Sequence, residues 1–200
     1  MHSDLIVFGE NWGRQPTDTH HLVRHLGTER RVVWVNSPVL RCCASCPHGQ
    51  DQPSDMGDYR PDRILAPLAQ HISSDAASRA DNQQLLGHQI RTAMSMLELR
   101  RPILLSAVPT AIDAVGELDE HAVVYYCDTN FTLMADVSCC SIKAMEAELA
   151  VRADLIIAAT PELARRFPRH RTVVIDQDDE ADGSWTARAA TVGRLLDQLA

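Results

Sequence analysis

Short apolar runs alternate along the chain with stretches in which apolar residues recur at helical spacing. The runs that we interpret as strands cover residues 5–8, 31–36, 63–68, 103–105, 122–126, 154–159 and 172–175. Most are rich in β-branched residues and bounded by turn signals, as expected for strands buried on both faces of a parallel sheet. The alternation predicts an α/β fold: a Rossmann-like open parallel sheet of about seven strands with helices on both faces.

The longest helix expected from the pattern covers residues 82–100. Its apolar stripe is formed by Leu86, Ile90, Ala93 and Leu97. An earlier helix begins at Thr17 or Asp18, which can cap it, and a later one ends near Arg152. These helices follow or precede predicted strands, as crossover helices of a parallel sheet do.

The character of the chain changes after residue 175. Residues 176–183 form an acidic run that cannot bury enough apolar surface to order itself. Ser184 then suits an N-cap, and Trp185, Ala189, Val192, Leu196 and Leu199 fall on one helical face that must dock to be stable. We therefore expect a Rossmann-like domain over 1–175, an acidic linker over 176–183 and a docking helix over 184–200.

Composition narrows the possible functions. The net charge of -8 and the isoelectric point near 5.5 argue against nucleic-acid binding by the surface as a whole, although they allow a local basic pocket. No apolar run approaches the roughly 20 residues of a membrane-spanning helix, and the amino terminus lacks the pattern of a secretory signal. We therefore expect a cytoplasmic protein with no transmembrane segment.

A glycine-bounded loop, Gly9-Glu-Asn-Trp-Gly13, follows the first strand. Glycine lets the backbone turn sharply and approach a ligand at the carboxyl edge of the sheet, where open α/β proteins bind small molecules. The glycine spacing differs from the dinucleotide fingerprint, and the second strand ends in Asn36 rather than in an acid for a ribose hydroxyl. A nicotinamide-dependent dehydrogenase is therefore disfavoured.

The opening Phe8-Gly-Glu-Asn-Trp-Gly-Arg14, with Pro16 and Thr19-His-His-Leu22, resembles that of bacterial glycosyltransferases with two facing Rossmann-like domains. These are the GT-B enzymes of teichuronic-acid and exopolysaccharide biosynthesis. Later segments follow in the family order at residues 31–37, 101–104, 109–111, 123–128, 144–148 and 153–156. The resemblance covers about residues 4–175.

In that family the first domain holds the acceptor, the second grips the nucleotide sugar, and a terminal helix crosses back onto the first domain. The residues that grip the donor have no counterpart here, whereas residues 184–199 resemble the terminal helix. The resemblance thus implies the acceptor-side half of a truncated glycosyltransferase that is inactive alone. Its partners would be a saccharide or lipid-linked acceptor, met at the inner membrane, and a separate donor-binding domain.

Asp128 is the candidate catalytic residue. It directly follows a buried strand, where a carboxylate can orient an acceptor hydroxyl or act as a base, and it can also cap the next helix. The candidate substrate-binding residues come from the first loop and the helix after it: Gly9, Glu10, Asn11, Trp12, Gly13, Arg14, His20 and His21.

These substrate-binding candidates offer different contacts. Arg14 carries a forked set of donors suited to phosphate, and Trp12 can stack on a sugar face or simply pack. Neutral imidazoles at His20 and His21 can hydrogen-bond a hydroxyl, with surface helix positions as the simpler interpretation.

Six cysteines leave a further hypothesis open: Cys42, Cys43, Cys46, Cys127, Cys139 and Cys140. Cys43-Ala-Ser-Cys46 has the spacing of half a zinc site, but adjacent cysteines suit tetrahedral coordination poorly, so we expect reduced thiols and neither metal nor cofactor. Three functions therefore remain: a nucleotide-sugar-dependent glycosyltransferase, a non-catalytic binding or assembly module, and a Cys-dependent metal or redox protein.

Overall fold

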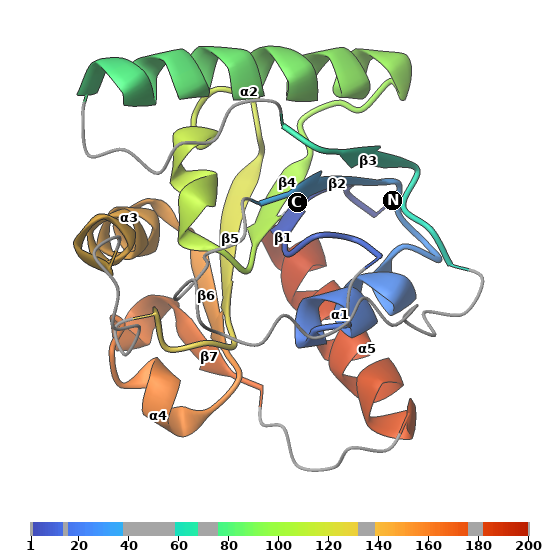
Figure 1. Cartoon of the computed structure of the whole chain (residues 1–200). Coiled ribbons are helices and arrows are strands. Elements are labelled where there is room, and N and C mark those ends of the chain that lie inside the picture. Colours follow the sequence, from blue (N-terminus) through green and yellow to red (C-terminus); the bar gives the residue numbers. More distant parts are fainter. Residues whose placement is uncertain are drawn as a thin grey trace.

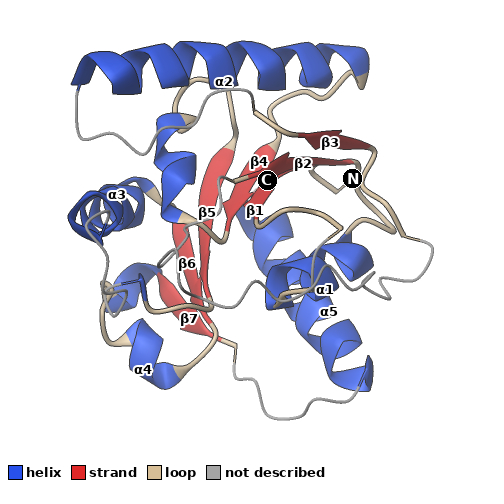
Figure 2. Cartoon of the chain, viewed as in Figure 1, coloured by secondary structure: helices blue, strands red, loops and turns tan. Residues whose placement is uncertain are grey.

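The first strand of the protein is β1, Leu5–Gly9, an interior strand whose first four side chains have at most 1% of their surface exposed. The computed structural model describes residues 2–13, 16–37, 59–67, 76–131, 139–175 and 182–199. In these ranges seven parallel strands form one open sheet flanked by helices (Figures 1 and 2). The other strands are β2 (Val32–Asn36), β3 (Arg63–Leu65), β4 (Ile103–Ser106), β5 (Ala122–Cys127), β6 (Leu155–Ala158) and β7 (Thr172–Val174).

The strand order β3-β2-β1-β4-β5-β6-β7 confirms the predicted Rossmann-like topology. From β1 the chain builds outward to β2 and β3, returns to place β4 on the other side of β1, and then builds outward to β7. The order of strands therefore reverses between β1 and β4. Open α/β sheets bind their ligands outside the carboxyl ends of the strands at such a point.

Helices cover both faces of the sheet. They are α1 (Asp18–Leu26), α2 (Ala76–Met96), α3 (Cys139–Arg152), α4 (Pro161–Ala164) and α5 (Asp182–Leu199), with short 3₁₀ helices η1 (Pro109–Asp113) and η3 (Arg169–Arg171). Because strand side chains alternate, Ile6 and Phe8 join a core with α2, η1 and α3, whereas Leu5 and Val7 join a core with α1 and α5. The expectation of helices on both faces is thus confirmed.

The predicted boundaries shift at a few elements. The strand expected over 63–68 ends at Leu65, just before Pro67, which has no N–H for the sheet ladder. Helix α2 begins at Ala76 and ends at Met96, close to Glu98, whose φ of 53° lies in the left-handed region. Helix α5 begins at Asp182, two residues before the N-cap expected at Ser184.

The carboxy-terminal helix docks on the body as predicted. Ala189, Val192 and Leu196 of α5 are buried in the core shared with α1, and Figure 1 shows the two helices on the same side of the sheet. Across the described residues, no helix combines the length and apolar character needed to cross a bilayer.

Candidate functional site

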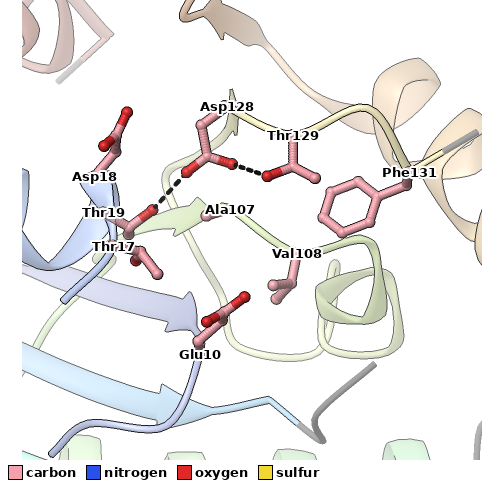
Figure 3. Close-up of a pocket in the computed structure, with 9 residues that line it drawn as sticks. All are labelled: Glu10, Thr17, Asp18, Thr19, Ala107, Val108, Asp128, Thr129 and Phe131. Atoms are coloured by element: carbon pink, nitrogen blue, oxygen red, sulfur yellow. Dashed lines mark hydrogen bonds between the residues drawn. The ribbon is translucent and has the colours of Figure 1, made fainter. Parts of the chain in front are cut away.

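A cavity of about 230 Å³ opens at the carboxyl edge of the sheet, where the strand order reverses. It lies between the ends of β1, β4 and β5 and the beginning of α1 (Figure 3). We call it the Asp128 cavity. Its lining residues are Glu10, Thr17, Asp18, Thr19, Ala107, Val108, Asp128, Thr129 and Phe131.

Asp128, the predicted catalytic residue, comes directly after β5 and points into this cavity (Figure 3). The Thr129 hydroxyl donates to one carboxyl oxygen at 3.0 Å, and the Thr19 hydroxyl donates to the other at 3.5 Å. Burial raises the pKa of Asp128 to about 6, and the nearby carboxylates of Asp18 and Glu10 also favour its protonated form. A carboxyl group that titrates this close to neutrality can exchange a proton under physiological conditions.

The charges around the cavity are of one sign. Glu10, Asp18 and Asp128 contribute carboxyl groups, and the remaining polar lining consists of threonine hydroxyls. Among the described residues no arginine, lysine or histidine lines the cavity. Such a surface repels phosphate and suits ligands that present hydroxyl or ammonium groups.

The glycine loop reaches the cavity through Glu10 alone. Gly9 ends β1, and its carbonyl accepts the backbone N–H of Ser37 at 2.8 Å. Gly13 adopts a φ of 95°, a left-handed conformation that glycine tolerates. Asn11, within the loop, is partly buried, and Arg14 lies outside the described residues.

Trp12 belongs to a cluster of rings rather than to the cavity lining. Its ring centroid lies 4.8 Å from that of Trp34, 5.1 Å from His20 and 6.0 Å from Tyr59. We call these four residues the aromatic cluster, to which the loop contributes Trp12. The packing alternative considered for Trp12 therefore describes its environment, and its stacking on a sugar stays a prediction.

Asn36 anchors the loop, a role that the sequence reasoning missed. Its side-chain oxygen accepts the backbone N–H of Trp12 at 2.9 Å and the indole N–H of Trp34 at 3.0 Å. The same indole N–H also lies 3.1 Å from the carbonyl of Glu10. An amide at the end of β2 was visible in the sequence, but its partners depend on the register of β2 against β1.

His20 is fully buried, so the surface position preferred for it was wrong. Its Nδ1 accepts the backbone N–H of Thr17 at 3.2 Å and lies 2.8 Å from the Thr17 hydroxyl. Burial, followed by the proximity of His21, lowers the pKa of His20 to about 4. The imidazole is therefore neutral at physiological pH and fixes the start of α1 beside the cavity.

His21 points elsewhere. Its ring stacks on that of Trp185 in α5, with centroids 5.2 Å apart and an interplanar angle of 23°. The Trp185 ring also lies beneath the guanidinium of Arg188, at 4.6 Å. His21 thus contributes to the docking of α5 and does not line the Asp128 cavity.

Five further residues line the cavity that were not predicted from the sequence: Thr17, Asp18, Thr19, Thr129 and Phe131. A usable signal existed for the first three, because a helix that follows the first strand begins at the ligand-binding edge. Thr129 and Phe131 follow Asp128 at the same edge.

The described residues contain no group of three or more His, Cys, Asp or Glu that could hold a metal ion. Cys42, Cys43 and Cys46 lie outside these residues, as do the side chains of Cys139 and Cys140. Cys127 is buried at the end of β5, and burial raises the pKa of its thiol to about 11. It is therefore a protonated core thiol rather than a nucleophile.

No protein-family model and no curated protein matches the chain. Among solved structures it is similar to one of sucrose-phosphate synthase from Thermosynechococcus elongatus, with a TM-score of 0.56 and 10% sequence identity. The match covers 98% of each chain. At this identity the likeness is one of fold, and the chain has a glycosyltransferase-like, Rossmann-type α/β fold.

Proposed function

We propose that the chain is the acceptor-side half of a glycosyltransferase and that the Asp128 cavity holds an acceptor hydroxyl of a saccharide. The observation that carries the proposal is the position of Asp128, a carboxyl group with a pKa of about 6 where the strand order reverses. The glycosyltransferase-like fold supports the same assignment.

In the proposed reaction Asp128 acts as the base. Its carboxylate takes the proton of the acceptor hydroxyl while that oxygen forms a bond to the anomeric carbon of a nucleotide sugar. The bond from this carbon to the diphosphate breaks, and the nucleoside diphosphate leaves with the electron pair. Thr19 and Thr129, which donate to Asp128, orient the carboxylate toward the hydroxyl.

The other half of the reaction needs groups that the cavity does not provide. A leaving diphosphate must be held and neutralised by cations, and none lines the described part of this cavity. We therefore propose that a separate domain binds the nucleotide sugar and that this chain alone does not catalyse sugar transfer.

The connection before the last helix supports this division. Only residues 176–181 join Ile175 to α5, too few to form a domain of their own.

The negative charge of the cavity limits the classes of saccharide that can serve as the acceptor. Three carboxyl groups disfavour sugar phosphates and uronic acids, whereas neutral or amino-bearing saccharides are compatible with them. The sugar residue of a polysaccharide or of a lipid-linked acceptor at the cytoplasmic face of the inner membrane fits this description. The acceptor's phosphate, where it has one, would lie outside the cavity.

A panel of methyl glycosides tests the proposal by two-dimensional NMR on the isotopically labelled chain. We expect neutral and amino-bearing glycosides to shift resonances of Thr19 and Thr129, and the Asp128→Asn variant to bind at least fivefold more weakly. Glu117→Gln, an exposed carboxylate away from the cavity, serves as the matched control. The absence of any glycoside binding at 50 mM would remove the basis for the acceptor assignment.

Activity is measured on the same material. UDP-glucose and related nucleotide sugars should be neither hydrolysed nor transferred by the isolated chain. Sustained turnover would contradict the proposed division between two domains, and it would restore the interpretation as a complete enzyme.

A non-catalytic binding or assembly module is the second candidate. It is favoured by the lack of basic residues around the described part of the cavity, because a module that only binds saccharides needs no group for a leaving diphosphate. The Asp128→Asn variant separates the two candidates. Unchanged glycoside binding by this variant would favour the binding module.

A further inference from the structure

A second cavity, of about 330 Å³, lies between α3 and the segment that follows α4. The Asp128 cavity shares no lining residue with it. Ala147, Ala150 and Val151 of α3 form one wall, and Phe167 and Pro168 form the opposite one. We call it the α3–α4 cavity. Nothing in the proposed glycosyl transfer uses it.

The apolar walls carry basic groups. Lys143 lines the cavity from α3, and Arg166 and Arg171 line it from the facing segment. The only acid in the described lining is Glu146, which has 3% of its surface exposed. Glu146 is already occupied, since it accepts the Tyr125 hydroxyl at 2.9 Å and pairs with a guanidinium nitrogen of Arg166. The lining therefore keeps a positive balance.

Two guanidinium groups at the cavity each have an unpaired nitrogen donor, which we call the spare donors. Nη1 of Arg166 and Nε of Arg171 are buried and have no hydrogen-bond acceptor among the described residues. Each side chain is held through another nitrogen: Nη2 of Arg166 pairs with Glu146, and Nη1 of Arg171 donates to the carbonyls of Val151 and Ala153, both at 2.9 Å. Buried donors in protein structures are nearly always paired, so two unpaired ones at one cavity indicate a missing acceptor.

The surrounding sequence is basic in an acidic protein. Residues 165–171 include four arginines, although the whole chain carries a net charge of -8. Arg165 pairs with Glu162 at 3.4 Å outside the cavity, whereas Arg166 and Arg171 face it. A local field of this sign attracts anions to a site that the protein as a whole would repel.

We propose that the α3–α4 cavity binds a small organic oxyanion, a phosphate or carboxylate carried on an apolar body. The oxyanion accepts the spare donors of Arg166 and Arg171 and pairs with Lys143, while the apolar body lies against Phe167, Ala150 and Val151. Guanidinium groups match oxyanions of both kinds, because their planar donor sets fit two oxygens at once.

Phenyl phosphate is the probe, titrated into the full chain and followed by NMR and calorimetry. We expect saturable binding, with shifts at Lys143 and Phe167. Benzyl alcohol, which lacks the charge, and inorganic phosphate, which lacks the apolar body, should each bind at least tenfold more weakly. No saturation by 5 mM phenyl phosphate, or equal binding of benzyl alcohol, would overturn the proposal.

Variants at exposed positions localise the binding without disturbing the core. Lys143→Ala should weaken it at least fivefold, and Val151→Glu, which places a carboxylate beside the spare donors, should abolish it. Val151 has 69% of its surface exposed, and Val151→Gln controls for the size of the new side chain. Arg165→Ala, which removes an arginine outside the cavity, should bind normally. Binding that is indifferent to both Lys143→Ala and Val151→Glu would place the anion elsewhere and refute the assignment.

A final arm separates a free anion from a lipid headgroup. Vesicles of phosphatidylcholine with phosphatidic acid present the same phosphate on an extended surface. Competition between the vesicles and phenyl phosphate would support the cavity and identify a lipid as one source of its ligand. Vesicle binding without any binding of phenyl phosphate would overturn the cavity in favour of surface attraction.

Discussion

A Cβ atom added to Gly9 would lie 2.4 Å from Cζ2 of Trp34 and 2.5 Å from its Cη2. Trp34 is fully buried, and its indole is held by hydrogen bonds to Asn36 and Glu10, so the ring cannot move aside freely. We therefore expect Gly9→Ala to destabilise the protein by about 2 kcal/mol through overpacking. Urea unfolding followed by fluorescence measures the change.

Gly193→Ala is the matched control for this prediction. Its added Cβ would meet Leu26 at 3.6 Å, an ordinary contact, and the residue lies within α5. Replacing a helical glycine by alanine should stabilise the protein by about 0.5–1 kcal/mol. Equal stability of wild type and Gly9→Ala would show that the ring adjusts at little cost.

The fold was accessible from the sequence because each central strand is buried on both faces, which leaves a clear apolar run between turn signals. The position of Asp128 at the carboxyl edge followed from the same pattern, because a residue just after a parallel strand must lie there. Its catalytic role stays a prediction. The reversal of strand order that places Glu10 and Asp128 at one cavity required only that the topology was correct.

The surroundings of the glycine loop were not accessible in this way. In the sheet, Trp34 is paired with Val7 and Asn36 with Gly9, so the indole lies diagonally across from Gly9. Periodicity does not give register, and the sequence therefore could not show that Gly9 leaves room for a ring. His20 was misplaced for a related reason, since a polar residue on the buried face of α1 looks like a surface residue until its partner Thr17 is known.

Asp128→Asn should change stability in a pH-dependent way. The folded-state pKa of about 6 lies above the ordinary value of 3.8, so the folded state binds more protons between these values. Wild-type stability from this group is then lost as the pH rises from about 4 to 6. At pH 4 the free energy of unfolding of the asparagine variant should equal that of the wild type. At pH 8 it should be higher by about 1–2 kcal/mol, after allowance for the partial exposure of Asp128.

The measurement is urea unfolding of both proteins at the two pH values. Because other groups titrate in the same range, the informative quantity is the difference between variant and wild type at each pH. An asparagine variant that is less stable than the wild type at pH 8 would mean that the hydrogen bonds from Thr19 and Thr129 outweigh burial of the charge.

His20 should contribute a slope of the opposite sign. Its pKa is lowered to about 4 in the folded state from 6.5, so the unfolded state binds more protons between these values. Stability from this group is complete above pH 6.5, and about 2–3 kcal/mol of it is lost as the pH falls to 4. Ring carbon NMR should show an inflection for His20 near pH 4.

The companion variant is His20→Asn, whose side-chain oxygen can accept the Thr17 backbone N–H in place of Nδ1. The stability of His20→Asn should lack this loss between pH 6.5 and pH 4, whereas the stability of His21→Asn should still show it. An inflection of His20 near 6.5 would indicate that water reaches the ring, contrary to its full burial.

Arg30 should decide how firmly the carboxy-terminal helix is held. Its side chain has 2% of its surface exposed and donates to Asp197 at 2.5 Å, to the carbonyl of Gly193 at 3.2 Å and to that of Ser3 at 2.9 Å. Arg30→Met keeps the apolar stem and removes these donors, so we expect a loss of about 2–3 kcal/mol. Hydrogen exchange should quicken more in α5 than in β1 and β4, because the bonds lost to Gly193 and Asp197 join α5 to the body. Arg194→Met removes an exposed arginine that bonds only Thr191 of the same helix among the described residues, and it should leave exchange unchanged. If α5 exchanged at the wild-type rate in Arg30→Met, apolar packing alone would hold the helix, and the buried guanidinium would contribute nothing to its docking.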